Sequence, residues 1–334
     1  MNNTLIVGEV VKGYLGSEYG KYPSCTLAKM ILSQNPEVGT LNNIRSSVRY
    51  YRGQIGKRNR NRILDRHFFD QPETRMKYHA IPAEIPATDR KEYVPYTLAD
   101  GRWLVMGDGH VPYHEPEVIR LLVEYAVKHK VTGIVLLGDW IDAFMLSKFA
   151  KDPRKRNFKG ELEAMNGMLN YFEKKIKGKI VFKIGNHEAR LETYLYTQAP
   201  ALLEVVDYQY KDLLYLPERG ADLVKSEQII YAGHLTMLHG HEYRGSSNSP
   251  VNPARSMSLK AKACTLSAHE HRTSQNDEPT IKGASIANWS IGCCCELHPI
   301  YMPLNKWAWG GAIVEKHGMD FEVENKRIIK GAVV

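Results

Sequence analysis

The stretch Lys179-Ile-Val-Phe-Lys-Ile-Gly-Asn-His-Glu-Ala-Arg190 changes from apolar to polar without a spacer. Its first six residues are rich in β-branched and aromatic side chains, which is typical of a buried strand. An amide, an imidazole and a carboxylate follow directly at Asn186, His187 and Glu188. A turn after a strand needs glycine and asparagine, but it does not need the other two residues. The stretch therefore indicates that a strand ends in a functional site.

Four other apolar runs end in the same abrupt way. Acidic or imidazole side chains follow RWLVM at Gly107-Asp-Gly-His110, VTGIVLL at Gly138-Asp-Trp-Ile-Asp142, LTML at His239-Gly-His241 and ACTLS at Ala268-His-Glu-His271. Amphipathic segments at 116–128 and 161–177 lie between these runs and predict helices. Strands that alternate with helices predict an α/β layered fold.

The polar clusters fall where an α/β sheet binds its ligands. Ligands lie beyond the carboxyl ends of the strands in open α/β sheets, and the spacing of the clusters leaves room for one crossover between successive strands. Oxygen and imidazole donors without a thiol suit Mn, Fe, Zn or a similar divalent ion, and a shared carboxylate allows two ions ~3.5–4 Å apart. The side chains that we expect at this edge are Asp108, His110, Asp139, Asn186, His187, His239, His269 and His271.

The order of these blocks is Asp-x-His, Gly-Asp-x-x-Asp, Gly-Asn-His-Glu, His-Gly and His-x-His. It resembles that of the calcineurin-like metallophosphoesterases over residues 102–315. The resemblance implies two stacked mixed β-sheets flanked by helices. It also implies two divalent metal ions, with Mn as the first choice and Fe, Zn or Mg as alternatives. By this resemblance one ion would be held by Asp108, His110, Asp139 and His271, and the other by Asp139, Asn186, His239 and His269.

The resemblance also implies catalytic roles for two residues. Asp139 would bridge both ions, and a metal-bound hydroxide would act as the nucleophile. His187 would not bind metal, but it would stabilise the transition state or protonate the leaving oxygen. Three neighbours are candidates for supporting the ligands or contacting the substrate, namely His241, Asp142 and Arg190.

The metal ligands do not determine which ester is hydrolysed. Protein phosphatases of this superfamily carry arginine after the second aspartate of the second block, whereas Ala143 follows Asp142 here. We therefore predict a metal-dependent phosphoesterase that hydrolyses phosphodiester bonds in nucleic acid, as a nuclease does. The alternatives are a phosphomonoesterase, a small-nucleotide phosphodiesterase, and a non-catalytic DNA-binding or virion-associated protein that keeps the fold.

The positive charge of the chain is concentrated in residues 1–66. The formal net charge of the whole chain is +8, and this segment holds eleven Lys or Arg against four Asp or Glu. Two short helices are predicted here, one through Thr26–Leu32 and one through Ile44–Tyr51, with a proline and a glycine between them. Such a pair resembles a helix-turn-helix unit, and the segment resembles the leading part of phage-encoded members of the family.

The charge asymmetry predicts a polyanionic partner for this small all-α domain. Three arginines spaced four and three apart form a stripe on the second predicted helix, and further basic runs lie at 57–62 and 151–159. We expect nucleic acid as the partner, DNA more than RNA. The candidates for phosphate contacts are Arg45, Arg49, Arg52, Lys57, Arg58, Arg60, Arg62, Arg154, Lys155 and Arg156.

Four prolines within residues 67–98 predict a linker between the all-α domain at 1–66 and a phosphoesterase domain at 99–334. No window approaches eighteen consecutive apolar residues, so no membrane span is expected. The first residues lack the basic region that opens a secretory signal. Five cysteines without Cys-x-x-Cys spacing predict buried thiols in a reducing cytosol, that of a bacterium or a phage-infected host.

Overall fold

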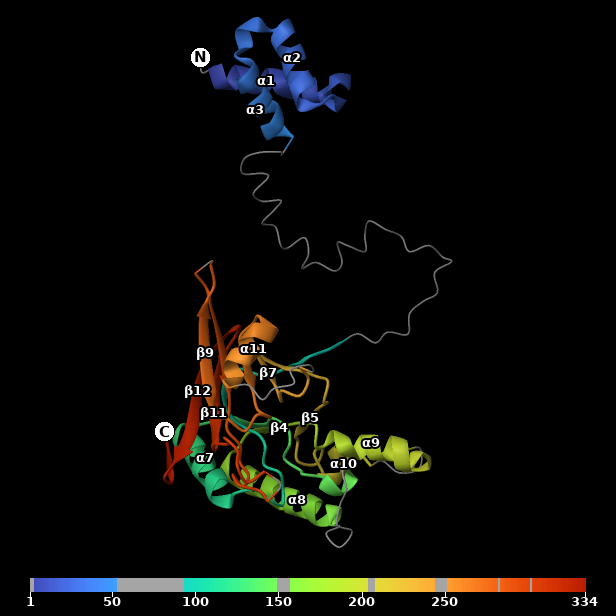
Figure 1. Cartoon of the computed structure of the whole chain (residues 1–334), viewed down its shortest axis with the longest axis vertical. Helices are drawn as coiled ribbons and strands as arrows, with labels where there is room; N and C mark the ends of the chain where they lie inside the picture. Colours follow the sequence, from blue (N-terminus) through green and yellow to red (C-terminus); the bar gives the residue numbers. More distant parts are fainter. Residues whose placement is uncertain are drawn as a thin grey trace. The chain divides into compact units, whose positions relative to one another are not determined.

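The computed structural model describes residues 3–52, 93–148, 157–203, 208–243, 251–281, 283–300 and 302–334. The chain divides into two compact units, residues 1–90 and residues 91–334 (Figure 1). None of the described helices is long and apolar enough to cross a lipid bilayer.

The N-terminal unit is helical. Its described elements are α1 (Asn3–Gly16), η1 (Glu18–Lys21), α2 (Ser24–Gln34), η2 (Pro36–Val38) and α3 (Leu41–Tyr51). The helices α2 and α3 include both helices that the sequence predicts. The side chain of Thr40 caps α3 by accepting the N–H of Asn43. Buried aliphatic side chains from all three α-helices form one small core, which includes Val11, Ile31 and Ile44.

The second unit contains two mixed β-sheets, as the sequence predicts. One has the order β1-β6-β7-β8-β10-β9, and the other has the order β13-β12-β11-β2-β3-β4-β5. The strands are β1 (Tyr96–Thr97), β2 (Gly101–Met106), β3 (Gly133–Leu136), β4 (Lys179–Lys183), β5 (Asp222–Val224), β6 (Ile230–Ala232), β7 (Leu235–Leu238), β8 (Thr265–Ser267), β9 (Ser274–Pro279), β10 (Ser285–Ser290), β11 (Gly310–His317), β12 (Asp320–Ile329) and β13 (Ala332–Val333).

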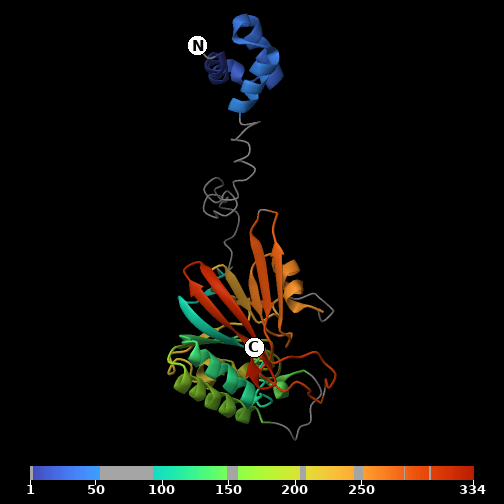
Figure 2. The same cartoon turned by 90° about the vertical axis from the view of Figure 1, so that its left-hand side faces the viewer.

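Two apolar cores hold the layers of this unit together. One core joins the two sheets face to face, since it contains Val105 and Val135 of one sheet with Met237 and Leu266 of the other. The second core lies between the outer face of the seven-stranded sheet and the helices that cover it. The described helices and short 3-10 turns of the whole second unit are α7 (Pro116–Lys128), η3 (Phe144–Leu146), α8 (Phe158–Lys175), α9 (Ala189–Gln198), η5 (Pro200–Leu202), α10 (Tyr210–Leu213) and α11 (Pro253–Ala261). Figure 2 shows α7 and α8 (green) beside the seven-stranded sheet and α11 (orange) beside the six-stranded sheet.

Parallel pairing brings the polar clusters to one edge. Strands β2, β3 and β4 run parallel, and Met106, Leu136 and Phe182 lie in register at their carboxyl ends. In the other sheet β7 and β8 are also parallel, with Leu238 beside Ser267. Each of these strands is followed within a few residues by one of the predicted polar blocks, so both sheets contribute to one site.

The predicted linker overlaps this unit at its carboxyl end. Residues Tyr96–Thr97 lie within the predicted linker 67–98, yet they form β1 and pair in parallel with β6. Pro95 directly precedes this strand, a position at the edge of a sheet that proline tolerates. Residues 53–92 lie outside the described part of the chain, and the division at 66 and 98 stays a prediction.

Candidate metal centre

Two clusters of ligand-type side chains share Asp139. The ligand atoms of Asp108, His110 and Asp139 all lie within 4.8 Å of one another, and so do those of Asp139, His239 and His269. All five side chains come from the loops that follow β2, β3, β7 and β8. The structure therefore places a shared carboxylate between two potential ligand sets.

Each aspartate fixes one oxygen with a backbone N–H and turns the other oxygen inward. Asp139 Oδ1 accepts the N–H of His187 at 2.9 Å, whereas Oδ2 lies 3.1 Å from His239 Nε2. Asp108 Oδ2 accepts the N–H of His269 at 2.9 Å. Its buried Oδ1 accepts no well-aligned hydrogen bond among the described residues and lies 3.3 Å from His271 Nε2. Buried carboxylate oxygens that face imidazole nitrogens suit a cation between them.

The imidazoles also face one another through nitrogen atoms. His110 Nε2 lies 3.2 Å from His271 Nε2, and His239 Nε2 lies 3.2 Å from His269 Nδ1. Nearby, Asn186 Oδ1 is buried and has no hydrogen-bond partner among the described residues. Imidazole nitrogens and side-chain oxygens that converge in this way fit coordination to divalent ions. All seven residues predicted to bind metal thus offer atoms to this site or lie beside it.

Five of these seven residues have left-handed backbone conformations. The φ angles are 54° at Asp108, 46° at His110, 53° at Asp139, 69° at His269 and 53° at His271. A non-glycine residue in this region costs about 1–3 kcal/mol and persists only when its surroundings hold it. Such strain concentrates at functional sites, and here five candidate ligands share it.

The two buried carboxylates raise the pKa of two histidines of the site. Burial disfavours the charged imidazole, but the carboxylate of Asp139 raises the pKa of His239 to about 9. In the same way Asp108 raises the pKa of His271 to about 10. Burial beside positively charged His239 lowers the pKa of His269 to about 4. Two buried carboxylates therefore require nearby positive charge, which divalent cations would supply in place of these protons.

Glu188 holds the loop that carries the shared carboxylate. The side chain is 1% exposed, and its two oxygens accept the N–H groups of Asp139, Trp140, Ile141 and Gly185 at 2.6–3.0 Å. A single carboxylate thus satisfies four backbone donors from the ends of β3 and β4. Sequence reasoning gave this residue no role, although its place directly after His187 was a signal.

Lys183 is a second supporting residue that sequence reasoning missed. It is 0% exposed, and its ammonium group contacts three backbone oxygens in the segment 225–228 and Glu242 Oε1 at 3.0 Å. Glu242 in turn accepts the N–H groups of His239 and Gly240. The ion pair therefore connects β4 to the loop that carries His239. A lysine at the end of an otherwise apolar strand, followed by Ile184, was the signal in the sequence.

His187 lies beside the clusters and is held by two neighbours. Its Nδ1 lies 2.9 Å from the backbone oxygen of Asp142 and 3.1 Å from Asp142 Oδ1, so Nδ1 carries the hydrogen. Arg190 donates one N–H to His187 Nε2 at 2.9 Å and another to the Asp142 backbone oxygen at 2.7 Å. Asp142 Oδ1 also lies 3.3 Å from His110 Nδ1. Asp142 and Arg190 therefore orient imidazoles of the site.

Two further side chains, His241 and Cys295, lie beside the candidate ligands. His241 Nε2 shares a hydrogen bond with Ser226 Oγ at 2.8 Å, and its ring lies 5.3 Å from that of His239. No thiol was predicted at the site, yet buried Cys295 Sγ lies 3.9 Å from His271 Nδ1. His110, His271 and Cys295 also have ligand atoms within 4.8 Å of one another.

The predicted nucleic-acid contacts are only partly within the described residues. Arg45 and Arg49 are exposed on α3. Arg52 is different, because its guanidinium donates to Ser24 Oγ and to the backbone oxygens of Gly20 and Tyr22. It ties α3 to the start of α2, so Arg45 and Arg49 are the exposed members of the predicted stripe. The remaining candidates lie outside the described residues, namely Lys57, Arg58, Arg60, Arg62, Arg154, Lys155 and Arg156.

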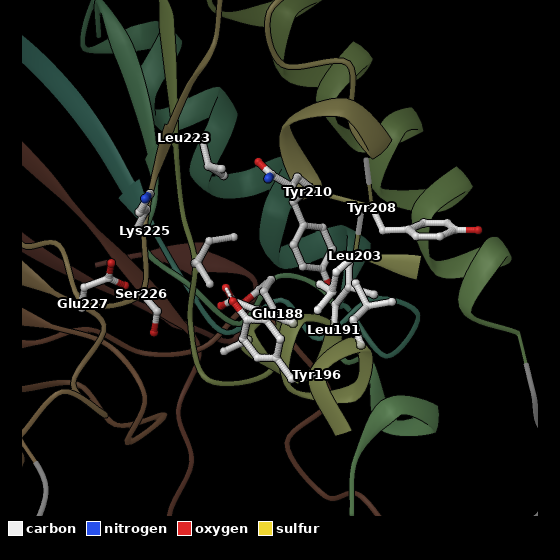
Figure 3. A pocket seen from close by; sticks show the side chains of 15 residues that line it. Glu188, Leu191, Tyr196, Leu203, Tyr208, Tyr210, Leu223, Lys225, Ser226 and Glu227 are labelled. Atoms are coloured by element: carbon white, nitrogen blue, oxygen red, sulfur yellow. Dashed lines mark hydrogen bonds between the residues drawn. The ribbon is translucent and has the colours of Figure 1, made fainter. Parts of the chain in front are cut away.

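Two cavities flank the site. One, of about 670 Å³, is lined by His110 and His187 and continues away from the metal ligands. The other, of about 290 Å³, lies on the far side of Glu188 between α9 and β5 (Figure 3). The ring of Tyr210 points into this smaller cavity, and its buried hydroxyl has no hydrogen-bond partner among the described residues.

Comparisons with known proteins find distant similarity. No protein-family model matches the chain. The Gene 54 protein of Mycobacterium phage L5 is 24% identical over 179 residues, which cover 51% of this chain and 69% of the phage protein. A Vps29 single mutant from Entamoeba histolytica has 9% identity and a TM-score of 0.38, covering 70% of this chain and 96% of that chain. The E. coli phosphoesterase Yfce has 14% identity and a TM-score of 0.32, covering 64% and 88%. A dimetal phosphatase from Danio rerio has 12% identity and a TM-score of 0.36, covering 68% and 95%.

These similarities do not establish a function for the chain. The names of the similar structures include a phosphoesterase, a dimetal phosphatase and a vacuolar sorting protein. The phage relative agrees with the phage link expected from the sequence.

Proposed function

We propose that residues 91–334 form a metal-dependent phosphodiesterase that acts on nucleic acid. The observation that carries this proposal is the arrangement of ligand atoms around Asp139. Carboxylate, amide and imidazole groups from both sheets converge there with lone pairs directed at one another. Buried groups of this kind are costly without cations, whereas two divalent ions would satisfy them.

Seven residues would hold the two ions. One set is Asp108, His110, Asp139 and His271, and the other is Asp139, Asn186, His239 and His269, with Asp139 in both. A pair of bound divalent ions, Mn first and Fe, Zn or Mg as alternatives, neutralises charge on the phosphoryl group and activates water for in-line attack. Glu188 and Lys183 hold the loops in which these ligands lie, so they fix the geometry.

His187 and Arg190 are the side chains that would act on the substrate without binding metal. The imidazole faces the open side of the clusters, 3.8 Å from Asp139 Oδ2, and Arg190 fixes its orientation. His187 supplies positive charge to the transition state, or a proton to the leaving oxygen from Nε2. Either role requires that Nε2, which accepts from Arg190 in this structure, release Arg190 and first take up a proton from solvent. The freed guanidinium N–H groups then lie within reach of a phosphoryl oxygen.

The preference for nucleic acid rests on the N-terminal unit. Arg45 and Arg49 are exposed, four residues apart on α3, in a segment with a strong excess of positive charge. Such a helix supplies phosphate contacts without base specificity. We expect DNA more than RNA as the partner, with the protein in the cytosol of a bacterium or a phage-infected host.

An assay series tests this function. Manganese-loaded protein should hydrolyse bis(p-nitrophenyl) phosphate faster than p-nitrophenyl phosphate. The substrates to compare next are single-stranded DNA, duplex DNA, RNA and cyclic nucleotides. Preference for the monoester would identify a phosphomonoesterase, and preference for cyclic nucleotides would identify a small-nucleotide phosphodiesterase. Complete inactivity with every metal would favour a non-catalytic binding protein.

A further inference from the structure

The larger cavity begins at the metal centre and continues beyond it. Its volume is about 670 Å³, within the range of small-molecule sites. His110 and His187 form its inner end, and Arg190 lies in the same wall. A phosphate held between the metals would therefore place one of its ester substituents in this cavity.

Aromatic side chains from three separate segments form the outer walls. Tyr113 follows β2, Phe144 belongs to η3, and Trp307 precedes β11. Tyr113 is 51% exposed and Phe144 is 38% exposed, although both are large apolar side chains. Trp307 also packs on a ligand, because its ring centre lies 4.2 Å from that of His271. The aromatic walls are thus continuous with the metal centre.

We propose that this cavity binds the nucleobase of the nucleoside whose phosphate lies at the metals. The proposal rests on the proposed function, which places the phosphate. Flat rings stack on aromatic side chains with about 1–3 kcal/mol per base, whichever base is present. Glu296 adds a charged group to the same walls, which can pair with the polar edge of a base. A flexible acyl chain would pack on the same rings, but it has no polar edge to pair with Glu296.

Binding measurements on the full-length, manganese-loaded protein test the cavity directly. Titration calorimetry would compare thymidine 5′-monophosphate, methyl phosphate and octyl phosphate. We expect the nucleotide to bind about tenfold tighter than methyl phosphate, and tighter than octyl phosphate. Equal affinities for the nucleotide and methyl phosphate would overturn the proposal. Tightest binding of octyl phosphate would overturn it as well and assign the cavity to an aliphatic chain.

Variants test whether the aromatic walls cause the tighter binding of the nucleotide. Phe144→Ala should weaken nucleotide binding about fivefold to tenfold and change methyl phosphate binding less than twofold. Trp307→Ala should act in the same direction, but Trp307 also touches His271, so Phe144 is the cleaner site. The control is Tyr194→Ala, since Tyr194 is 37% exposed on α9 and does not line this cavity. Equal effects of Phe144→Ala on both ligands would count against stacking.

Hydrolysis of bis(p-nitrophenyl) phosphate separates this inference from the proposed function. If the protein hydrolyses no ester but still prefers the nucleotide, the catalytic proposal fails and the base-binding cavity stands. If hydrolysis is robust but the nucleotide gains nothing over methyl phosphate, the enzyme stands and the cavity assignment fails.

Discussion

Asp139 directs its two carboxylate oxygens to different partners. One accepts the His187 N–H, and the other faces the ligand nitrogens. Asparagine can still accept the N–H, but it lacks the charge that two cations share. Asp139→Asn should therefore keep the fold, abolish hydrolysis and lower the metal content well below two ions per chain. Elemental analysis and circular dichroism check this, with Asp320→Asn on an exposed position of β12 as the control. Unchanged two-ion occupancy would show that Asp139 does not bridge.

His187 should contribute to the rate without binding metal. His187→Ala should retain both ions and lose about 10²–10⁴-fold in kcat. If the imidazole protonates the leaving oxygen, the loss should shrink for p-nitrophenyl esters, whose leaving group needs no proton. Rates for a series of leaving groups, with metal content measured on each sample, check this. An equal loss for good and poor leaving groups would leave charge stabilisation as the role.

At this scale, residues whose environment follows from local sequence could be predicted. The seven ligand positions each follow an apolar run, and the structure brings those positions together. Lys183 and Arg52 could not be placed correctly, because their roles depend on partners far along the chain. Arg52 looked like part of an exposed stripe, yet its guanidinium meets carbonyl groups about thirty residues earlier. Left-handed φ angles at non-glycine ligands likewise have no local signal.

The start of α8 is joined to the loop that follows the shared carboxylate. Glu161 lies in the first turn of α8 and accepts the N–H of Ala143 at 2.7 Å. Burial raises the pKa of this carboxyl from 4.5 to about 7. The folded state therefore holds a proton more tightly than the unfolded state, so this group favours folding below pH 4.5. That contribution is lost as the pH rises from 4.5 to about 7.

Removing this ionisation should stabilise the protein in neutral and alkaline solution. Glu161→Gln keeps an oxygen for Ala143 but cannot ionise. Its free energy of unfolding should exceed that of the wild type by roughly 1–2 kcal/mol at pH 8, allowing for solvent screening, and by little at pH 4.5. Urea unfolding across this range checks the trend. The control is Glu163→Gln, an exposed position two residues along the same helix, which should show no such pH dependence. A constant difference at every pH would contradict the assignment.

Elements with strong periodicity were the most predictable. The sequence places a helix at 116–128 and one at 161–177, and the structure has α7 at Pro116–Lys128 and α8 at Phe158–Lys175. Strand β1 was missed because two residues after a proline carry no periodic signal. Its pairing with β6 depends on a segment more than a hundred residues away.

The two units of the chain should carry separable activities. Arg45 and Arg49 are exposed on α3, whereas the metal centre belongs to the other unit. If both arginines contact phosphates, the double variant Arg45→Ala/Arg49→Ala should lower the slope of log affinity against log salt by about 1.4–1.8. Hydrolysis of a small chromogenic diester should stay near the wild-type rate.

Salt titrations of DNA binding by metal-free protein measure this slope. The control removes the same charge from Lys174 and Lys175, which are exposed in the last turn of α8 in the other unit. If the slopes of the arginine variant and the wild type coincide, the N-terminal unit does not contact phosphates. Docking to another protein would then be its better explanation, and the preference for a nuclease would lose its main support.

Because the ligands come from both sheets, metal binding would act as a clasp across the sandwich. Asp108, Asp139 and Asn186 follow strands of one sheet, and His239 and His269 follow strands of the other. The two sheets could not separate without releasing an ion. The melting temperature should therefore depend on the concentration of free metal. Each tenfold rise in free manganese above its Kd should add about 1.4 kcal/mol per ion to the free energy of unfolding. Melting temperatures measured along a manganese series should climb steadily. A flat series would mean that the folded protein does not bind manganese in preference to the unfolded chain.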